Sequence, residues 1–190
     1  MSLKPFVRVN ATTAAEVCTR FNPKKQASAL LADGMAPAEF AKALIDRKQY
    51  LAGIDFMAHA LPAREAVWWG CLCLQHARGD SLPPADRAAC RAAVQWVMRP
   101  NEENRAAAVT PAQAAGPASP AGGLATAVCQ TGGSVASPNA PPTPSPPFAP
   151  AKAVAGAIKM ACTGVDPAKI IETQRLFLEL AMGMAEGRSL

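Results

Sequence analysis

The chain has 190 residues, of which 50% are hydrophobic and only 5% aromatic, and it carries a formal net charge of +5. This length is enough for one domain with a real core. Alanine supplies much of the hydrophobic total, and alanine with Leu, Met, Arg and Glu favours helices. The basic residues are scattered rather than gathered in a stripe, which argues against a nucleic-acid-binding protein.

Charged residues or prolines interrupt every apolar run before it reaches the roughly 20 residues of a membrane helix. The amino terminus has no continuous apolar region that would indicate a secretory signal, so we expect a cytoplasmic protein. The six cysteines lie in alanine-rich or aromatic surroundings. Cysteines of this kind behave as small buried hydrophobes, and we expect all six to be free thiols.

A Pro-Ala pair recurs along the chain, and proline favours the first position of a helix because its missing N–H and fixed φ suit that place. Six of these pairs, beginning at Pro37, Pro62, Pro84, Pro111, Pro150 and Pro167, are interpreted as helix starts. Thr110 and Asp166 stand directly before two of these prolines, where they can cap the helix. Gly34, Gly79 and Gly164 are predicted to end helices in the left-handed conformation.

These starts and stops predict an all-α fold, a single irregular bundle of about seven to nine helices with a proline-rich extended strap. No sustained alternation of apolar and polar residues indicates a strand. The third predicted helix can break at Gly53 or within the segment RKQYLAG. The predicted helices, in chain order, span residues 12–20, 23–33, 37–60, 62–78, 84–99, 101–115, 120–131, 150–163 and 167–186.

The helix at 62–78 contains the pair Trp68 and Trp69 and the pair Cys71 and Cys73. Every residue from 66 to 74 is apolar, so we expect this helix to be enclosed on all sides. The two cysteines point about 200° apart around a helix axis, which excludes their sharing one metal ion. The tryptophans are therefore interpreted as core residues.

Residues 131–150 are too rich in proline for a helix or a central strand. This segment is interpreted as a strap or spacer, ahead of a flexible linker or a ligand for a proline-binding groove, with residues 141–147 in polyproline II. TGGS at 131–134 is interpreted as a chain reversal. Residues 105–123 form a second candidate loose region despite their helical propensity.

The last helix carries a narrow polar stripe, which predicts burial on most of its circumference and a central place in the bundle. We divide the chain into an N-terminal helical segment (1–36), a helical core (37–130), the strap or linker (131–150) and C-terminal helices packing on the core (151–190).

Chemical motifs are sparse. Asp55 and His59, four residues apart, have the spacing of a base and its orienting carboxylate, but a surface i,i+4 hydrogen bond is favoured. Arg64 is expected to reach a carboxylate of a neighbouring helix. No spacing of His and Cys indicates a metal site, and we expect no cofactor.

The combination of LPAREAVWWGCLC, GGSVASPNAPPTPSPP and AKAVAGAIKMAC resembles an uncharacterised bacterial family, a domain of unknown function associated with type VI secretion gene clusters. The resemblance runs from about residue 37 to the end, apart from an alanine-rich insertion at 106–123. It implies a cytoplasmic helical accessory protein, an adaptor or chaperone for a secreted effector or spike component.

We therefore expect a non-catalytic protein-binding factor whose partner is a protein rather than nucleic acid or a membrane. Trp69 and His76, on one face of their helix, and Pro142 and Phe148, in the strap, are the predicted partner-binding residues. The alternative is a small hydrolase or thiol enzyme that uses the Asp55/His59 pair or a cysteine.

Overall fold

The protein is described by a computed structural model, which covers residues 4–79, 81–132 and 144–188. The predicted fold class is confirmed: the chain is an all-α packed bundle of about eight substantial helices, with no strand in the described ranges. The elements are α1 (Ala14–Cys18), α2 (Lys25–Ser28), α3 (Pro37–Asp46), α4 (Tyr50–Ala60), α5 (Ala63–Arg78), α6 (Pro84–Met98), α7 (Glu102–Ala107), α8 (Val109–Ala115), α9 (Pro120–Cys129), α10 (Ala149–Thr163), the 3₁₀ helix η1 (Pro167–Lys169) and α11 (Ile170–Ala185).

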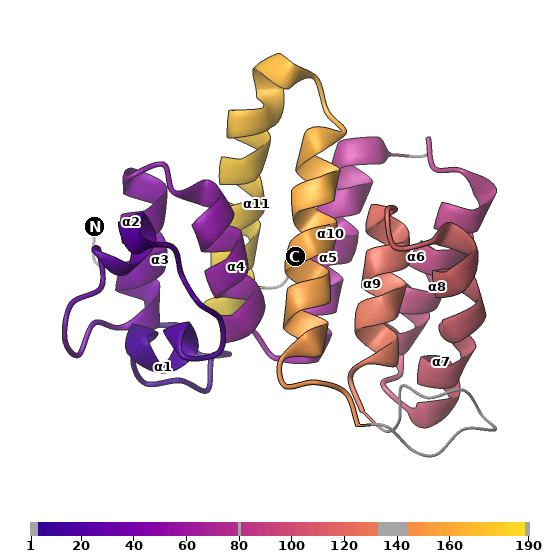
Figure 1. Ribbon diagram of the computed structural model, residues 1–190, viewed down its shortest axis with the longest axis horizontal. Coiled ribbons are helices and arrows are strands. Elements are labelled where there is room, and N and C mark those ends of the chain that lie inside the picture. The colour runs from indigo at the N-terminus through magenta and orange to yellow at the C-terminus, as the bar shows by residue number, and fades with distance from the viewer. Residues whose placement is uncertain (1–3, 80, 133–143, 189–190) are drawn as a thin grey trace.

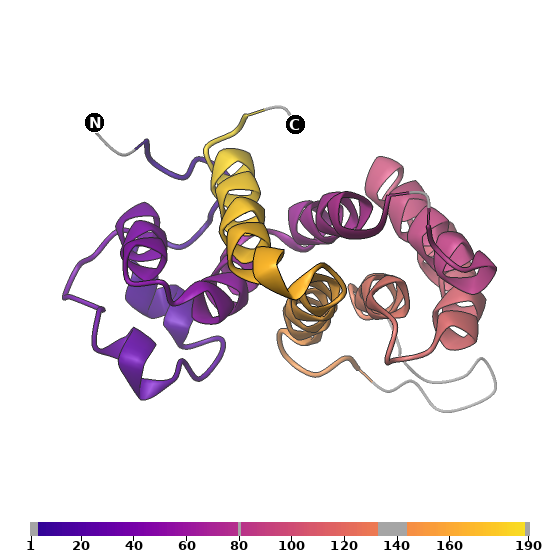
Figure 2. The ribbon, with the colours of Figure 1, turned by 90° about the horizontal axis from the view of Figure 1, so that it is seen from above.

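The helices form two groups joined through the middle of the molecule (Figure 1). The N-terminal helices α1–α4 lie at one end, helices α6–α9 lie at the other, and α5, α10 and α11 lie between them. Seen from above, α10 runs beside α9 and lies close to the N-terminal end of α11 (Figure 2). Helix α10 contacts α4, α5, α9 and α11, so it connects both groups.

The prediction that the last helix occupies the centre was wrong in part. Helix α11 packs against α3, α4 and α5 through one face that includes Phe177 and Leu178, but Ile171 is 59% exposed. Apolar residues outside the polar stripe can remain at the surface, because a folded protein has too few polar side chains to cover it. The central position belongs to α10.

One predicted helix break is confirmed, and two predicted segments differ from the structure. The predicted helix at 37–60 breaks within RKQYLAG, where Lys48 has a φ of 56°, and Gly53 lies inside α4. Only Lys25–Ser28 of the segment 23–33 is α-helical. Residues 105–123 are not a loose region, since α7, α8 and the start of α9 cover most of it.

The predicted start and stop signals act as expected at only some positions. Pro62 is the N-cap of α5, Pro150 is the second residue of α10, and Thr110 and Pro111 lie inside α8 rather than at its start. Pro37 and Pro84 occupy first helical positions, and the Asp166 side chain accepts a hydrogen bond from Ala168 N. Gly79 ends α5 with a φ of 53°, a conformation that glycine adopts without steric cost. Gly164, in contrast, has a φ of −90°, so the left-handed stop predicted there was wrong.

Small residues let the central helices approach one another closely. A Cβ added at Gly53 in α4 would lie 2.7 Å from Leu178 Cδ1, and one added at Gly70 in α5 would lie 2.3 Å from Leu124 Cδ2. Between α9 and α10, a Cβ at Gly123 would lie 3.1 Å from the Ala157 Cβ. The abundance of alanine therefore reflects close helix packing as well as helix propensity.

Much of the predicted strap lies outside the described residues. Residues 133–143, which include Pro142 and part of TGGS, are among these. Helix α10 begins at Ala149, one residue before the predicted helix start at 150, and Phe148 is its N-cap. The four-segment division of the chain stays a prediction.

Candidate functional site

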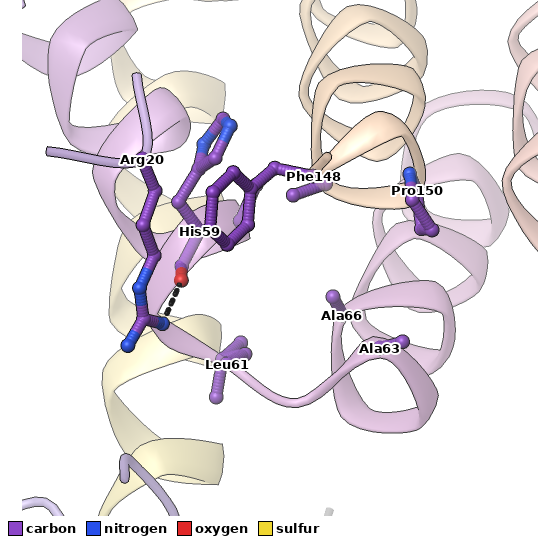
Figure 3. A pocket seen from close by; sticks show the side chains of 9 residues that line it. Arg20, His59, Leu61, Ala63, Ala66, Phe148 and Pro150 are labelled. Atoms are coloured by element: carbon purple, nitrogen blue, oxygen red, sulfur yellow. Dashed lines mark hydrogen bonds between the residues drawn. The ribbon is translucent and has the colours of Figure 1, made fainter. Parts of the chain in front are cut away.

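A pocket of about 250 Å³ lies where four segments meet (Figure 3). The segment after α1 contributes one wall, the end of α4 another, and the first turns of α5 and α10 complete it. Its lining residues are Arg20, Ala58, His59, Leu61, Ala63, Ala66, Phe148, Pro150 and Ala151. The pocket thus has mostly small apolar walls with one cation and one imidazole.

Arg20 is fixed at the pocket by two contacts. Its Nη1 donates a hydrogen bond to the carbonyl oxygen of His59 at 2.8 Å, and its guanidinium carbon lies 5.9 Å from the centre of the Phe148 ring. A cation within about 6 Å of an aromatic ring is attracted by the ring's quadrupole. Arg20 therefore ties the segment after α1 to the ends of α4 and α10.

His59 is buried near the end of α4, with only 4% of its surface exposed. Its ring stacks on Phe21 at 4.9 Å, and its Nδ1 lies 2.7 Å from the backbone oxygen of Asp55. A carbonyl only accepts, so Nδ1 carries the proton and Nε2 is the acceptor of the neutral ring. Nε2 is buried without a hydrogen-bond partner among the described residues.

Burial lowers the pKa of His59 below its ordinary value of 6.5. The nearby charges of Lys152 and Arg20 lower it further, whereas the carbonyl and the carboxylate of Asp55 oppose the shift. The neutral ring is therefore the form that the folded protein favours.

Folding stability should decrease as the pH falls below about 6.5 because of His59. Between the lowered folded pKa and the unfolded value of 6.5, the unfolded chain binds more protons, so the free energy of unfolding rises with pH. Urea unfolding at pH 5 to 7.5 measures this slope. His59→Gln should reduce it, whereas His76→Gln, at an exposed position, should keep it; equal slopes in all three proteins would contradict the prediction.

An i,i+4 hydrogen bond joins His59 to Asp55, as the sequence favoured, but it is buried and uses the Asp55 backbone, so the alternative pair of side chains does not form. The Asp55 carboxylate instead forms an ion pair with Lys159 of α10, and His59 uses the Asp55 backbone oxygen. Lys159 is 104 residues away along the chain, so local spacing could not reveal it. The Asp55 carboxylate therefore does not orient the His59 imidazole as the carboxylate of a catalytic dyad would.

Phe148 stands at the mouth of the pocket, 45% exposed. It adopts a left-handed backbone conformation with a φ of 57°, which is uncommon for a bulky residue. Its ring lies 6.3 Å from that of His59 as well as near Arg20. The fold therefore leaves this aromatic residue about half exposed in a backbone conformation that is costly for it. Phe148 is one of the four predicted partner-binding residues.

The structure separates the other three predicted residues from this pocket. Trp69 is fully buried, and its Nε1 donates a hydrogen bond to the Phe177 oxygen at 2.7 Å. His76 is exposed and meets the Phe177 ring edge to face at 5.9 Å, so α11 lies against the face that Trp69 and His76 share. Pro142 lies outside the described residues. Binding through any of them stays a prediction.

Two other sequence expectations about α5 need correction. Arg64 does not reach a carboxylate: its Nε donates to the Val97 oxygen at 2.7 Å, near the C-terminus of α6, where a cation is favoured. Helix α5 is not enclosed on all sides, because Trp68 and Leu72 are only half-buried.

All six cysteines carry free thiols. Burial raises the pKa of the Cys18, Cys73 and Cys129 thiols, and it raises that of Cys162 to about 11. Cys90 differs, because a hydrogen bond from the Cys71 thiol stabilises its thiolate and lowers its pKa. The same contact, together with burial, raises the pKa of Cys71.

Cys90 should be the first of the six cysteines to react with iodoacetamide in the native protein. The thiolate is the reactive form, and Cys90 is partly exposed as well as lowered in pKa. Brief labelling at increasing pH, followed by peptide mass spectrometry, measures the order. Cys129 is the internal control, since it is also partly exposed but has a raised pKa; faster labelling of Cys129, or no slowing of Cys90 in Cys71→Ala, would refute the prediction.

Sequence reasoning did not identify Arg20, which reaches His59 across 39 residues. Lys152, whose charge acts on His59, could have been noticed in the sequence, because it lies in the first turn of α10, where an acidic residue is favoured over a basic one. Within 4–79, 81–132 and 144–188, no three His, Cys, Asp or Glu side chains gather in a way that could hold a metal ion. No helix in those ranges has the length and apolarity to span a bilayer.

The described residues define an all-α protein with a partly apolar recess beside Arg20 at the junction of four segments. By sequence, the chain belongs to a family of unknown function, DUF6931, whose model matches residues 40–185. The predicted membership of an uncharacterised family is thus confirmed, but nothing found links this family to type VI secretion. Neither the curated proteins nor the solved structures gave a significant match.

Proposed function

We propose that this protein is a non-catalytic accessory factor that binds a partner protein at the pocket around Phe148. The observation that carries the proposal is Phe148 itself, an aromatic side chain kept half in solvent at a left-handed backbone position. Aromatic residues and arginine are enriched where proteins bind one another, and Arg20 lies against the same ring.

The surroundings of Phe148 support binding rather than chemistry. The remaining walls are mainly alanine, leucine and proline, which offer contact area and no reactive group. His59 is neutral in the folded protein, and its Nδ1 is occupied by a backbone oxygen rather than a carboxylate. Binding of a partner accounts for these features, and no catalysed reaction is needed to explain them.

We further propose that the factor acts in the cytoplasm as an adaptor or chaperone for a type VI secretion effector or spike component. This part rests on the sequence resemblance alone. Six free thiols agree with a reducing compartment.

Co-purification of the tagged protein from its native host, with quantitative mass spectrometry, tests the proposal. We expect one stoichiometric partner, reduced at least severalfold by Phe148→Ala. The matched control is Met98→Ala, which removes an apolar side chain that is 69% exposed and does not line the pocket.

Absence of a stoichiometric partner would refute protein binding as the function. If both variants lose the partner to the same extent, or if neither variant loses it, the assignment of binding to the pocket is refuted. A partner unrelated to secretion would refute only the type VI assignment.

A further inference from the structure

Helices α5 and α6 form an antiparallel hairpin whose register is marked at both of its ends. Only the segment 79–83 joins the two helices, and a connection this short places two contacting helices side by side in opposite directions. At the other end of the hairpin, the Arg64 Nε in the first turn of α5 donates to the Val97 oxygen in the last turn of α6. The ends of the two helices are therefore aligned.

This register places Cys71 of α5 opposite Cys90 of α6. Cys71 follows Arg64 by seven residues, and Cys90 precedes Val97 by seven residues. Seven residues are almost two full turns of an α-helix, so each cysteine lies on the same side of its helix as the residue that marks the register. Because the helices are antiparallel, both cysteines then lie at the same level of the hairpin.

The two thiols are in contact, as this register requires. The Cys71 thiol donates a hydrogen bond to the Cys90 sulfur. Alanine occupies the neighbouring buried positions Ala89 and Ala93 of α6, and such small side chains let packed helices approach closely. Disulfide formation requires the two Cβ atoms to lie near each other, and thiols already in hydrogen-bond contact need only a small displacement to reach that geometry.

The pair combines one accessible sulfur with one protected sulfur. Cys90 is partly exposed, whereas Cys71 is only 3% exposed. The hydrogen bond from Cys71 also lowers the pKa of Cys90, which favours the thiolate, the form that oxidants attack. An accessible thiolate beside a second thiol that can displace its oxidised product is typical of redox-sensitive cysteines.

The other four cysteines lack this combination. Cys18, Cys73 and Cys162 are buried, and their burial raises the pKa of each thiol. Cys129 is partly exposed, but burial raises its pKa as well, and the charged group beside it is Arg105 rather than a second thiol. Cys90 is therefore the one cysteine that is both accessible and in contact with another thiol.

We propose that Cys90 and Cys71 form a peroxide-sensitive thiol pair, in which Cys90 is the sulfur that peroxide oxidises and Cys71 is the thiol that resolves it into a disulfide. The Cys90 thiolate attacks one oxygen of hydrogen peroxide, the O–O bond breaks, and the departing hydroxide takes a proton from solvent to become water. Cys90 is then a sulfenic acid.

The second step joins the two helices. The Cys71 sulfur attacks the Cys90 sulfur, the S–O bond breaks, and the thiol proton leaves with the hydroxyl group as a second water. The two thiols lose two electrons in total, and these electrons reduce the peroxide. This modification site goes beyond the proposed partner binding and does not depend on it.

Peroxide treatment of the full chain in its native state tests the proposal. The reduced protein is oxidised, its remaining thiols are blocked with iodoacetamide, and it is digested with trypsin without a reductant. Trypsin cleaves after Arg78 and Arg87, so the linked cysteines are recovered as two joined peptides, and fragmentation distinguishes Cys71 from Cys73. We expect the link to Cys90 from Cys71 to exceed every other disulfide at least about tenfold, because only Cys90 offers an accessible thiolate. Dithiothreitol should remove it.

Single substitutions distinguish the oxidised sulfur from the resolving one, with dimedone present to trap sulfenic acid. In Cys71→Ala, the sulfenic acid at Cys90 has no thiol to resolve it, so its dimedone adduct should increase at least about threefold over the wild type. Cys90→Ala should give neither the link nor an adduct at Cys71. Cys129→Ala, which removes the other partly exposed cysteine, is the matched control and should form the link normally. Circular dichroism establishes that each variant is folded, and the wild-type link is measured without any substitution.

The proposal is overturned if the peroxide-treated wild type contains no disulfide between Cys71 and Cys90, or if another pair of cysteines links equally well. Oxidation of Cys90 to a sulfinic acid without the link would also overturn it, because Cys71 would then not act as the resolving thiol. A dimedone adduct at Cys71 in Cys90→Ala would overturn the assignment of Cys90 as the sulfur that peroxide attacks.

Discussion

Replacement of Trp69 by alanine is expected to lower the free energy of unfolding by about 3–5 kcal/mol. The indole is fully buried, and its Nε1 donates a hydrogen bond to the Phe177 oxygen of α11. The variant therefore leaves a large cavity at the contact of α5 with α11 and removes a bond that spans 108 residues. Small domains have only about 5–15 kcal/mol of stability, so this loss is a large share.

Trp68→Ala is the matched control for this prediction, because the two tryptophans are adjacent in α5. Trp68 is only half-buried, and we expect its loss to cost about 1–2 kcal/mol, less than the removal of a fully buried side chain. Urea denaturation followed by far-ultraviolet circular dichroism measures both variants. Equal destabilisation by the two would show that Trp69 does not anchor α5 to α11.

The interpretation of the two tryptophans shows what local pattern can establish. An apolar run from 66 to 74 predicted a helix in the core, and α5 with the buried Trp69 confirms it. The same pattern could not show which side stays accessible, because the covering helix α11 lies about a hundred residues later. Phe177 of α11 therefore contacts both Trp69 and His76, which local spacing could not reveal.

The candidate site was harder to predict from the sequence than the core position of α5. Phe148, in the predicted strap, was one of the predicted partner-binding residues, and it lines the pocket. Arg20 and the N-terminus of α5 reach the same recess only through tertiary packing, and no spacing rule connects them. Local residues determine where a helix begins, whereas the packing of the whole bundle brings the first turns of α5 and α10 to the same pocket.

Glycine positions show a similar division between local and tertiary information. Of the three glycines predicted to end helices in the left-handed conformation, Gly79 does so, Gly164 ends α10 without a positive φ, and Gly34 has a positive φ where no helix ends. The sequence does not show which helical glycines are required by close packing. The structure separates these cases, because some glycines face backbone atoms and others face open space.

Gly122→Ala and Gly156→Ala should therefore change stability in opposite directions. A Cβ at Gly122 in α9 would lie 2.1 Å from the backbone oxygen of Gly116, which cannot move as a side-chain end could, so we expect a loss of about 1–3 kcal/mol or more. A Cβ at Gly156 in α10 meets nothing within 4 Å. There the better helix propensity of alanine should add about 0.4–1 kcal/mol.

Thermal and urea unfolding of the two variants measure this contrast with the same chemical change. Because both substitutions add one methyl group inside a helix, a difference in sign isolates the effect of the neighbouring backbone at Gly116. Gly116 ends α8 with a φ of 77°, and its carbonyl lies against the first turn of α9. Stabilisation by Gly122→Ala would mean that α8 and α9 are not packed this closely, and the arrangement of α6–α9 would need revision.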